Sequence, residues 1–315
     1  MKLKINENRP KNFEEFVGQS NIVENLKVYI HSAKVRKQRL DHMLFNGNSG
    51  LGKTSLAYLI ANEIKSNILV LNGTSLQRAS DIISPLTSLK DGDILFIDEI
   101  HAMSKEVFEV LYPVLEDNSL NVIVGKEYNS KVVNINLANF TFIGATTEIN
   151  KLSEPFINRF PINFLFQSYT NNEIAKILKL NSIKMNIDLK DEVIEFLSTH
   201  CKNNPRISIN ILKRIYDYII FNNPLVIDID YIKRVLVTLN IFQFGLNKRD
   251  IEYLKLLKDN NFIGIETLKQ MLNVSISVIL NHIEPTLLNE KLILKTLKGR
   301  TLTKKGLEYL SQLTI

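Results

Sequence analysis

One stretch decides the fold: Gly47-Asn48-Ser49-Gly50-Leu51-Gly52-Lys53-Thr54, which fits the pattern G-x-x-x-x-G-K-[ST]. The apolar run 43–45 before it predicts a short buried strand, and residues 54–64 after it predict a helix. In this strand–loop–helix setting the glycines let backbone N–H groups surround phosphate oxygens. Lys53 would reach the β- and γ-phosphates of a nucleotide, and the Thr54 hydroxyl would help to hold Mg²⁺. The alternative, a Gly-rich turn that merely precedes a helix, leaves the four matching positions unexplained.

Length and composition predict a globular protein with two or three domains, since the chain has 315 residues and is 45% hydrophobic. The net charge of +6 permits a nucleic-acid partner without demonstrating one. Cys201 is the single cysteine, which excludes an internal disulfide and is typical of a reducing compartment. The sequence contains neither a run of 18 apolar residues nor a signal-peptide pattern. We therefore expect a soluble, cytoplasmic protein.

The first half of the chain alternates strand and helix patterns, which predicts a doubly wound α/β domain over about residues 15–168. The expected strands are 43–45, 68–71, 94–97, 140–144 and 164–166. The expected helices are 21–37, 54–64 and 104–115. Residues 120–137 alternate apolar and polar side chains on two arms, which predicts a β-hairpin.

The second half predicts two smaller domains. Helical spacing without strands covers 171–181, 190–201, 207–221 and 230–239. Three helices follow at 250–258, 266–272 and 275–289, then a hairpin at 291–303 and a helix at 304–313, which is the order of a winged helix-turn-helix. We expect domains at 1–169 (large α/β domain), 170–243 (helical lid) and 244–315 (winged helix).

Polar residues that follow two predicted strands suit phosphoryl transfer. Asp98 and Glu99 follow a buried strand, where open α/β sheets bind ligands. Asp98 could hold Mg²⁺ through its water shell and Glu99 could orient or deprotonate the attacking water, although carboxylates that only cap a helix remain an alternative. His101 fits either a supporting role at this site or a solvated helix start. Thr146 and Thr147 end another strand and could contact the γ-phosphate or the water, but β-branched residues also belong in strands.

Cations elsewhere have two interpretations each. Arg159 and Arg206 could contact the γ-phosphate of a nucleotide or could form surface ion pairs. The predicted wing carries a run of cations without an intervening acidic residue: Lys291, Lys295, Lys298, Arg300, Lys304 and Lys305. Such a run indicates binding to a duplex backbone with little sequence specificity, while a protein-binding winged helix is the alternative.

Taken together, these residues resemble the AAA+ ATPases, and more narrowly the RuvB family. The resemblance runs from about residue 9 to 305. It rests on Arg9-Pro10, Phe16-Val17-Gly18-Gln19, Leu40-Asp41-His42, Gly50-Leu51-Gly52-Lys53-Thr54, Gly92 through His101, Leu111-Tyr112-Pro113, Glu116-Asp117, Ile143-Gly144-Ala145-Thr146-Thr147 and Lys298-Gly299-Arg300. It implies a ring-shaped ATPase, a hexamer in this family, that uses ATP and Mg²⁺ to drive branch migration of Holliday junctions in recombination and repair.

The resemblance also assigns site residues. The catalytic residues would be Lys53, Asp98, Glu99, Thr147, Arg159 and Arg206. Among them, Thr147 would be the sensor, Arg159 a finger entering the neighbouring subunit, and Arg206 the arginine of the lid. Thr54 and Asp98 would bind the metal. The nucleotide would lie against Arg9, Pro10, Phe16, Val17, Gly47, Asn48, Gly50, Leu51, Gly52, Lys53, Thr54, Ser55, Tyr169, Pro205 and Arg206. Lys295, Lys298 and Arg300 would bind duplex DNA.

Partners are implied by the same resemblance: the junction DNA, other copies of the chain, a RuvA-like junction-binding protein and a RuvC-like resolvase. Val122, Ile123 and Val124 near the hairpin tip would dock the RuvA-like protein, unless the hairpin is purely structural. The chain departs from the family pattern at Asn48-Ser49, where two prolines are usual, at Pro161 in place of glycine, and at Asn203-Asn204 in place of Gly-Thr. A clamp-loader-type ATPase, which would lack the winged helix, and a nucleotide-switched DNA-binding protein of the initiator kind are the competing interpretations.

Overall fold

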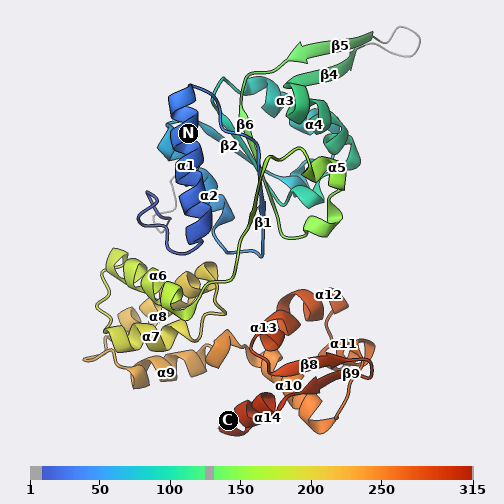
Figure 1. Ribbon diagram of the computed structural model, residues 1–315. Helices are drawn as coiled ribbons and strands as arrows, with labels where there is room; N and C mark the ends of the chain where they lie inside the picture. The colour runs from blue at the N-terminus through green and yellow to red at the C-terminus, as the bar shows by residue number, and fades with distance from the viewer. Residues whose placement is uncertain (1–8, 125–130, 314–315) are drawn as a thin grey trace. The chain divides into compact units, whose positions relative to one another are not determined.

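The computed structural model describes residues 9–124 and 131–313, without the side chains of residues 122–124 and 131–132. The chain forms two compact units, Met1–Tyr169 and Thr170–Ile315 (Figure 1). Among the described residues, no helix has the length and apolar character needed to cross a membrane.

The described part of the first unit is built on a five-stranded parallel sheet with the order β2-β3-β6-β1-β7. The strands are β1 (Met43–Asn46), β2 (Ile68–Asn72), β3 (Ile94–Asp98), β6 (Thr141–Thr146) and β7 (Ile162–Leu165). Strands β1, β3 and β6 are buried along nearly their whole length, because helices cover both faces of the sheet. The five expected strands are thus present, although β7 begins two residues before its expected start.

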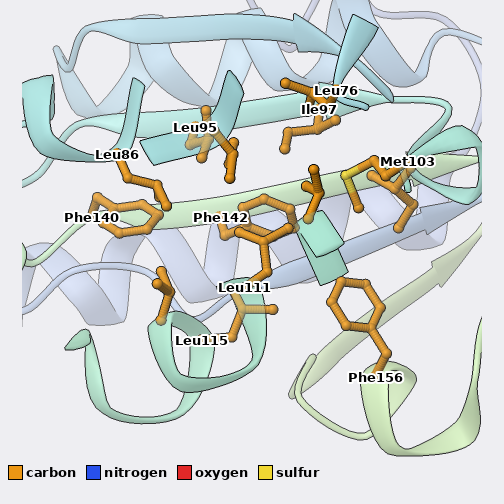
Figure 2. Packing of buried hydrophobic residues seen from close by; sticks show 14 of the residues in the cluster. Leu76, Leu86, Leu95, Ile97, Met103, Leu111, Leu115, Phe140, Phe142 and Phe156 are labelled. Carbon is orange, nitrogen blue, oxygen red and sulfur yellow. The ribbon is translucent and has the colours of Figure 1, made fainter. Parts of the chain in front are cut away.

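Helices α1 (Ser20–Arg36) and α2 (Lys53–Ile64) cover one face of the sheet (Figure 1). Helices α3 (Ala79–Ser88), α4 (Lys105–Asp117) and α5 (Glu154–Ile157) cover the other. Figure 2 shows the core beneath this second group. Its labelled members are Leu76, Leu86, Leu95, Ile97, Met103, Leu111, Leu115, Phe140, Phe142 and Phe156. Alternate residues of β3 point to opposite faces, so Leu95 and Ile97 enter this core.

A β-hairpin leaves the C-terminal end of α4 (Figure 1). Its strands β4 (Ser119–Val124) and β5 (Lys131–Asn136) pair antiparallel, as expected from the alternating pattern. Leu120 is buried at the base of the hairpin, whereas Val133 and Ile135 on β5 are exposed.

The second unit begins with four helices: α6 (Asn171–Lys184), α7 (Asp191–Ser198), α8 (Pro205–Asn222) and α9 (Ile229–Thr238). Asn204 caps α8, because its side chain accepts hydrogen bonds from the backbone N–H groups of Arg206 and Ile207 at 3.0 and 3.3 Å. The departure from the family pattern at this position therefore supplies a good helix start.

The remaining residues form a winged helix. Its elements are α10 (Lys248–Asp259), α11 (Ile265–Leu272), α12 (Ile276–Val278), a π-helical turn (Ile279–Ile283), α13 (Glu284–Asn289), the wing strands β8 (Ile293–Thr296) and β9 (Gly299–Leu302), and α14 (Lys304–Gln312). The single helix expected at 275–289 contains the π-helical turn just before Pro285, which has no N–H to donate to the preceding turn. A salt bridge of 2.8 Å between Lys202 Nζ and the buried Asp250 Oδ2 joins the loop before α8 to the first turn of α10.

Candidate active site

The loop between β1 and α2 has the shape of a phosphate-binding loop. Gly50 and Gly52 adopt φ angles of 84° and 100°, which favour glycine, and α2 begins directly after Gly52. The buried Lys53 ammonium donates hydrogen bonds to the carbonyl oxygens of Gly47 and Asn48, at 2.5 and 3.0 Å. The ammonium therefore lies inside the loop, where the phosphate oxygens of a nucleotide would also bind.

Aromatic residues of the first unit close around this loop. A Cβ atom on Gly52 would lie 3.1 Å from Phe16 Cζ, and the Tyr169 hydroxyl donates a hydrogen bond of 3.1 Å to the Leu51 carbonyl. The Arg9 guanidinium stacks over the Tyr58 ring of α2 at 4.6 Å from its centroid. Pro10 and Val17 are partly buried, and Ser55 occupies the first turn of α2. The structure thus brings Phe16 and Tyr169 to the loop, and Arg9 to the helix after it.

Two oxygen ligands suited to Mg²⁺ meet beside the loop. The Thr54 hydroxyl donates a hydrogen bond of 3.3 Å to Asp98 Oδ2, although the two residues come from α2 and β3. A hydroxyl and a carboxylate are hard donors of the kind that Mg²⁺ prefers. Asp98 Oδ1 accepts the backbone N–H of Glu99 at 3.1 Å, which fixes the orientation of the carboxylate. The donor set therefore fits a divalent cation bound next to phosphate.

Glu99 is held by the end of β6. Its Oε2 atom accepts hydrogen bonds from the Thr147 backbone N–H at 3.2 Å and from the Thr147 hydroxyl at 2.9 Å. Among the described residues, no such contact involves its Oε1 atom, which leaves that atom to meet a water molecule. Glu99 has a φ of 52°, in the left-handed region, so its carbonyl group turns toward the glycine after β2. The strand ends thus place the predicted base and the predicted sensor in direct contact.

His101 lies behind Glu99 and is only 11% exposed, so it is not the solvated histidine of the second interpretation. Its Nδ1 atom is 3.0 Å from Thr146 Oγ1 and 3.3 Å from Glu99 Oε2. Its Nε2 atom is 3.0 Å from Glu148 Oε2. The pKa of Glu148 is lowered by a hydrogen bond from Lys151 and, more weakly, by the charge of His101. No sequence motif pointed to Glu148, because its contact with His101 joins residues that are far apart in the sequence.

The two predicted arginines lie in different units. Arg159 comes just after α5, and its guanidinium donates to Glu116 Oε2 at 2.8 Å and stacks over the Tyr112 ring at 4.6 Å from the centroid. It therefore belongs to a surface of the first unit formed by α4 and α5. Pro205 and Arg206 occupy the first two positions of α8 in the second unit.

The wing cations do not form a uniform DNA-binding surface. Glu284 is fully buried, and it is contacted by Arg300 Nε at 2.8 Å, by Lys295 Nζ at 2.5 Å and by the Tyr253 hydroxyl at 2.9 Å. Burial raises the pKa of Glu284, but the hydrogen bonds from Arg300, Lys295 and Tyr253 outweigh it and the net pKa is lowered. Lys298 is exposed and lies 5.9 Å from the Phe262 ring centroid. Two of the three predicted DNA contacts thus neutralise a buried carboxylate.

The predicted partner residues can be placed only by their backbone. Val122, Ile123 and Val124 belong to β4, and their side chains lie outside the described residues. The exposed apolar side chains that the structure does describe on this hairpin are Val133 and Ile135.

A phosphate-binding loop beside an acidic strand end, on a parallel sheet of this order, defines a P-loop ATPase domain. Three protein-family models match the chain in order: the Holliday junction DNA helicase RuvB P-loop domain over residues 8–166, the RuvB AAA lid domain over 169–242 and the RuvB C-terminal winged helix domain over 243–311. The chain belongs to the RuvB family.

Relatives in sequence and in structure span nearly the whole chain. The Holliday junction branch migration complex subunit RuvB of Mycoplasmopsis pulmonis is 40% identical over 313 residues, covering 98% of this chain and 99% of that protein. The same subunit of Mycoplasmopsis synoviae is 42% identical over 306 residues, covering 96% of each chain. The solved structure of the Thermotoga maritima RuvB Holliday junction branch migration motor superposes with a TM-score of 0.84 at 34% identity, covering 97% of this chain and 98% of that one.

Proposed function

We propose that this chain is an ATP-driven motor that moves the branch point of Holliday junctions, working as a closed ring of identical subunits, a hexamer, together with a RuvA-like protein. The observation that carries the proposal is the meeting of Thr54, Asp98, Glu99 and Thr147 beside the loop of Lys53. These contacts occur in a chain that resembles RuvB proteins over nearly its full length, winged helix included. The winged helix disfavours a clamp loader, and the assembled base and sensor disfavour a pure nucleotide switch.

ATP and Mg²⁺ are the ligands that this site fits. The N–H groups of the loop and the start of α2 would bind the phosphates, Lys53 would exchange its two carbonyl contacts for phosphate oxygens, and Thr54 and Asp98 would hold the cation. Phe16 and Tyr169 would line the base pocket, with Arg9, Pro10 and Val17 nearby. When bound, the cation would neutralise charge on the phosphates.

The residues of this chain provide the proton acceptor for hydrolysis. Glu99 uses Oε2 to accept two hydrogen bonds from Thr147, so its carboxylate cannot rotate freely. Its Oε1 atom would accept a proton from the attacking water or orient that water. Thr147 would act through the position of Glu99, and Thr146 would act through His101.

Hydrolysis would also require a second subunit. The Arg159 guanidinium is held by residues of α4 and α5, which cover the face of the sheet opposite to α2 (Figure 1). In a ring with head-to-tail interfaces, this guanidinium would enter the site of the neighbouring subunit. Arg206 at the start of α8 would contact the γ-phosphate from the lid. An arginine at the transferred phosphate accelerates hydrolysis by about 10³–10⁵.

The second unit would transmit the motion to DNA. The salt bridge between Lys202 and the buried Asp250 ties the lid to the winged helix, so a rotation of the lid would carry the wing with it. Lys298 is an exposed candidate for a phosphate contact. Lys295 and Arg300 are weaker candidates because Glu284 already holds them. The β4–β5 hairpin would dock the RuvA-like protein, and a RuvC-like resolvase would act on the same junction. Such a motor would work in the cytoplasm of a bacterial cell, where the chromosome lies.

Steady-state ATPase activity with and without four-way junction DNA and the RuvA-like protein tests the proposal. We expect junction DNA to raise the hydrolysis rate, and we expect the chain, ATP, junction DNA and the RuvA-like protein together to move the branch point.

Lys53→Ala should abolish nucleotide binding, whereas Arg159→Ala should retain binding and lose hydrolysis. Normal hydrolysis by rings of Arg159→Ala would refute the finger assignment. Lys298→Ala should reduce the slope of log K against log salt by about 1, and an unchanged slope would make the wing a protein-binding element.

A further inference from the structure

The guanidinium of Arg159 is held at three points by its own subunit. Tyr112 and Glu116 lie one turn apart on the same face of α4. The Tyr112 ring lies under the guanidinium, Glu116 Oε2 accepts from Nη2 at 2.8 Å, and the Pro155 carbonyl accepts from Nη1 at 2.5 Å. The Tyr112 hydroxyl in turn forms a hydrogen bond of 2.8 Å with the hydroxyl of Ser153, the residue before α5. The two helices therefore form one holder for this side chain.

The holder leaves the guanidinium able to bind an anion. A guanidinium has five N–H groups, two on each terminal nitrogen and one on Nε. The bonds to Pro155 and Glu116 use one N–H on each terminal nitrogen, so a second N–H remains on each of them. The side chain as a whole is 25% exposed, while its Nε atom is buried and has no hydrogen-bond partner among the described residues. An arginine fixed in this way has already lost the rotamer freedom that it would otherwise lose on meeting a phosphate.

We propose that Tyr112 and Glu116 are positioning residues, which orient Arg159 toward the nucleotide of the neighbouring subunit. The inference rests on the proposed function, in which Arg159 acts in trans. The opposite interpretation, in which Glu116 withholds Arg159 from that nucleotide, predicts that removing the carboxylate raises the hydrolysis rate. The second N–H on each terminal nitrogen favours positioning, because the arginine need not leave Glu116 to bind a second anion.

The first experiment measures ATP hydrolysis by rings of single variants assembled on junction DNA. Glu116→Gln and Tyr112→Leu should each lower kcat about tenfold and leave KM unchanged, because the ATP-binding residues of each subunit are intact. Tyr112→Phe keeps the ring face and should retain most of the activity. Asp117→Asn removes the neighbouring exposed carboxylate of α4 and should have no effect. A kcat that is unchanged or raised by Glu116→Gln overturns the inference.

A double variant separates positioning from a general structural role. If Glu116 acts only through Arg159, then adding Glu116→Gln to Arg159→Ala should lower kcat no further. A further loss in the double variant would overturn the inference, since it would show that Glu116 acts by another route. Thermal unfolding of each variant shows whether the first unit remains folded.

Mixed rings test in which subunit the holder acts. Subunits with Lys53→Ala keep a finger and lose nucleotide binding, while subunits with Arg159→Ala keep the site and lose the finger, so mixing them should restore ATPase activity. Placing Glu116→Gln in the Lys53→Ala subunits should reduce this restored activity, and placing it in the Arg159→Ala subunits should not. Absence of any restored activity counts against the trans finger itself. If the restored activity is the same for both placements of Glu116→Gln, the proposed role of Tyr112 and Glu116 is wrong, while the trans action of Arg159 stands.

Discussion

Gly73 is predicted to be essential for hydrolysis although it belongs to no nucleotide-binding motif. It comes directly after β2, whose last residue Asn72 pairs with Asp98 of β3, so Gly73 and Glu99 lie side by side. A Cβ atom on Gly73 would lie 2.2 Å from the Glu99 carbonyl oxygen, whereas real contacts of this kind are essentially never under 3.0 Å. Gly73→Ala must therefore increase the separation between the backbones at residues 73 and 99 by at least about 0.8 Å, which disturbs the position of Glu99.

A displacement of this size should lower kcat strongly, because a misplacement of about 1 Å at a reacting group can reduce the rate about 100-fold. This rate loss corresponds to about 2.7 kcal/mol of transition-state stabilisation. Nucleotide affinity should change little, since the atoms nearest to a Cβ atom on Gly73 belong to Glu99 and Ile100 and not to the phosphate-binding loop. The measurements are steady-state ATPase activity and equilibrium binding of a fluorescent nucleotide.

Gly264→Ala is the matched control, since a Cβ atom at Gly264 meets no atom within 4 Å. It should leave both hydrolysis and nucleotide binding at the level of the unsubstituted protein. Hydrolysis at the normal rate by a folded Gly73→Ala protein would refute the reasoning, because it would show that the position of the Glu99 backbone does not limit the reaction.

Acid stability should depend on two buried groups. The net pKa of Glu284 is lowered in the folded state, so its contribution to stability is present above its ordinary pKa and is lost as the pH falls through the folded value. Glu284→Gln should destabilise the second unit by about 3 kcal/mol at pH 7, because it leaves Arg300 without its buried partner, and the loss should be smaller in acid. If urea unfolding gave the same loss of unfolding free energy for the variant at pH 7 and at pH 3, this prediction would be contradicted. Burial, assisted by the Arg39 charge, lowers the pKa of His42 to about 3 in the folded protein. As the pH falls below about 6.5, the imidazole is therefore protonated in the unfolded chain but not in the folded one. The free energy of unfolding should then fall by about 1.4 kcal/mol per pH unit. His42→Asn, which keeps an acceptor for the backbone N–H of Phe142, should flatten this dependence, and an unchanged slope would exclude His42 as its source.

The sheet was predictable from the sequence because its central strands are buried on both faces. The continuous apolar runs of β1, β3 and β6 mark such strands directly, and the phosphate-loop motif determines the loop and helix after β1. Helix α3 was not predicted, because Ala79–Ser88 is short, contains Pro85 and three serines, and is stabilised by packing of Ile82 and Leu86 into the core. The π-helical turn also has no local signal other than the proline after it.

The part of the candidate site that could be predicted from the sequence is the part formed by the ends of neighbouring strands. Parallel strands place their carboxyl ends at one edge of a sheet, so the pairing of β3 with β6 by itself brings the residues after β6, including Thr147, close to those after β3, including Glu99. Gly73 reaches the site through the register of β2 with β3, and Glu148 reaches it through its contact with His101. The local sequence around these two residues gives no sign of either relationship. The wing presented the opposite difficulty: its run of cations suggested DNA contacts, but the acid that holds two of them, Glu284, precedes the run and is buried.

Helix α4 connects the arginine surface to the β4–β5 hairpin. Glu116, near the end of the helix, holds Arg159, and three residues later the chain enters β4. The hairpin is fastened to the end of that helix by a hydrogen bond of 2.8 Å from the Leu137 N–H to the Asn118 carbonyl, and Asn118 also donates to the Asn139 side chain at 3.2 Å. The base of the hairpin is therefore joined directly to the last turn of α4. Under the proposed function, a protein bound to the hairpin would therefore act on the last turn of α4 and on Glu116, which holds Arg159, so the hairpin would serve as a mechanical input to the catalytic interface.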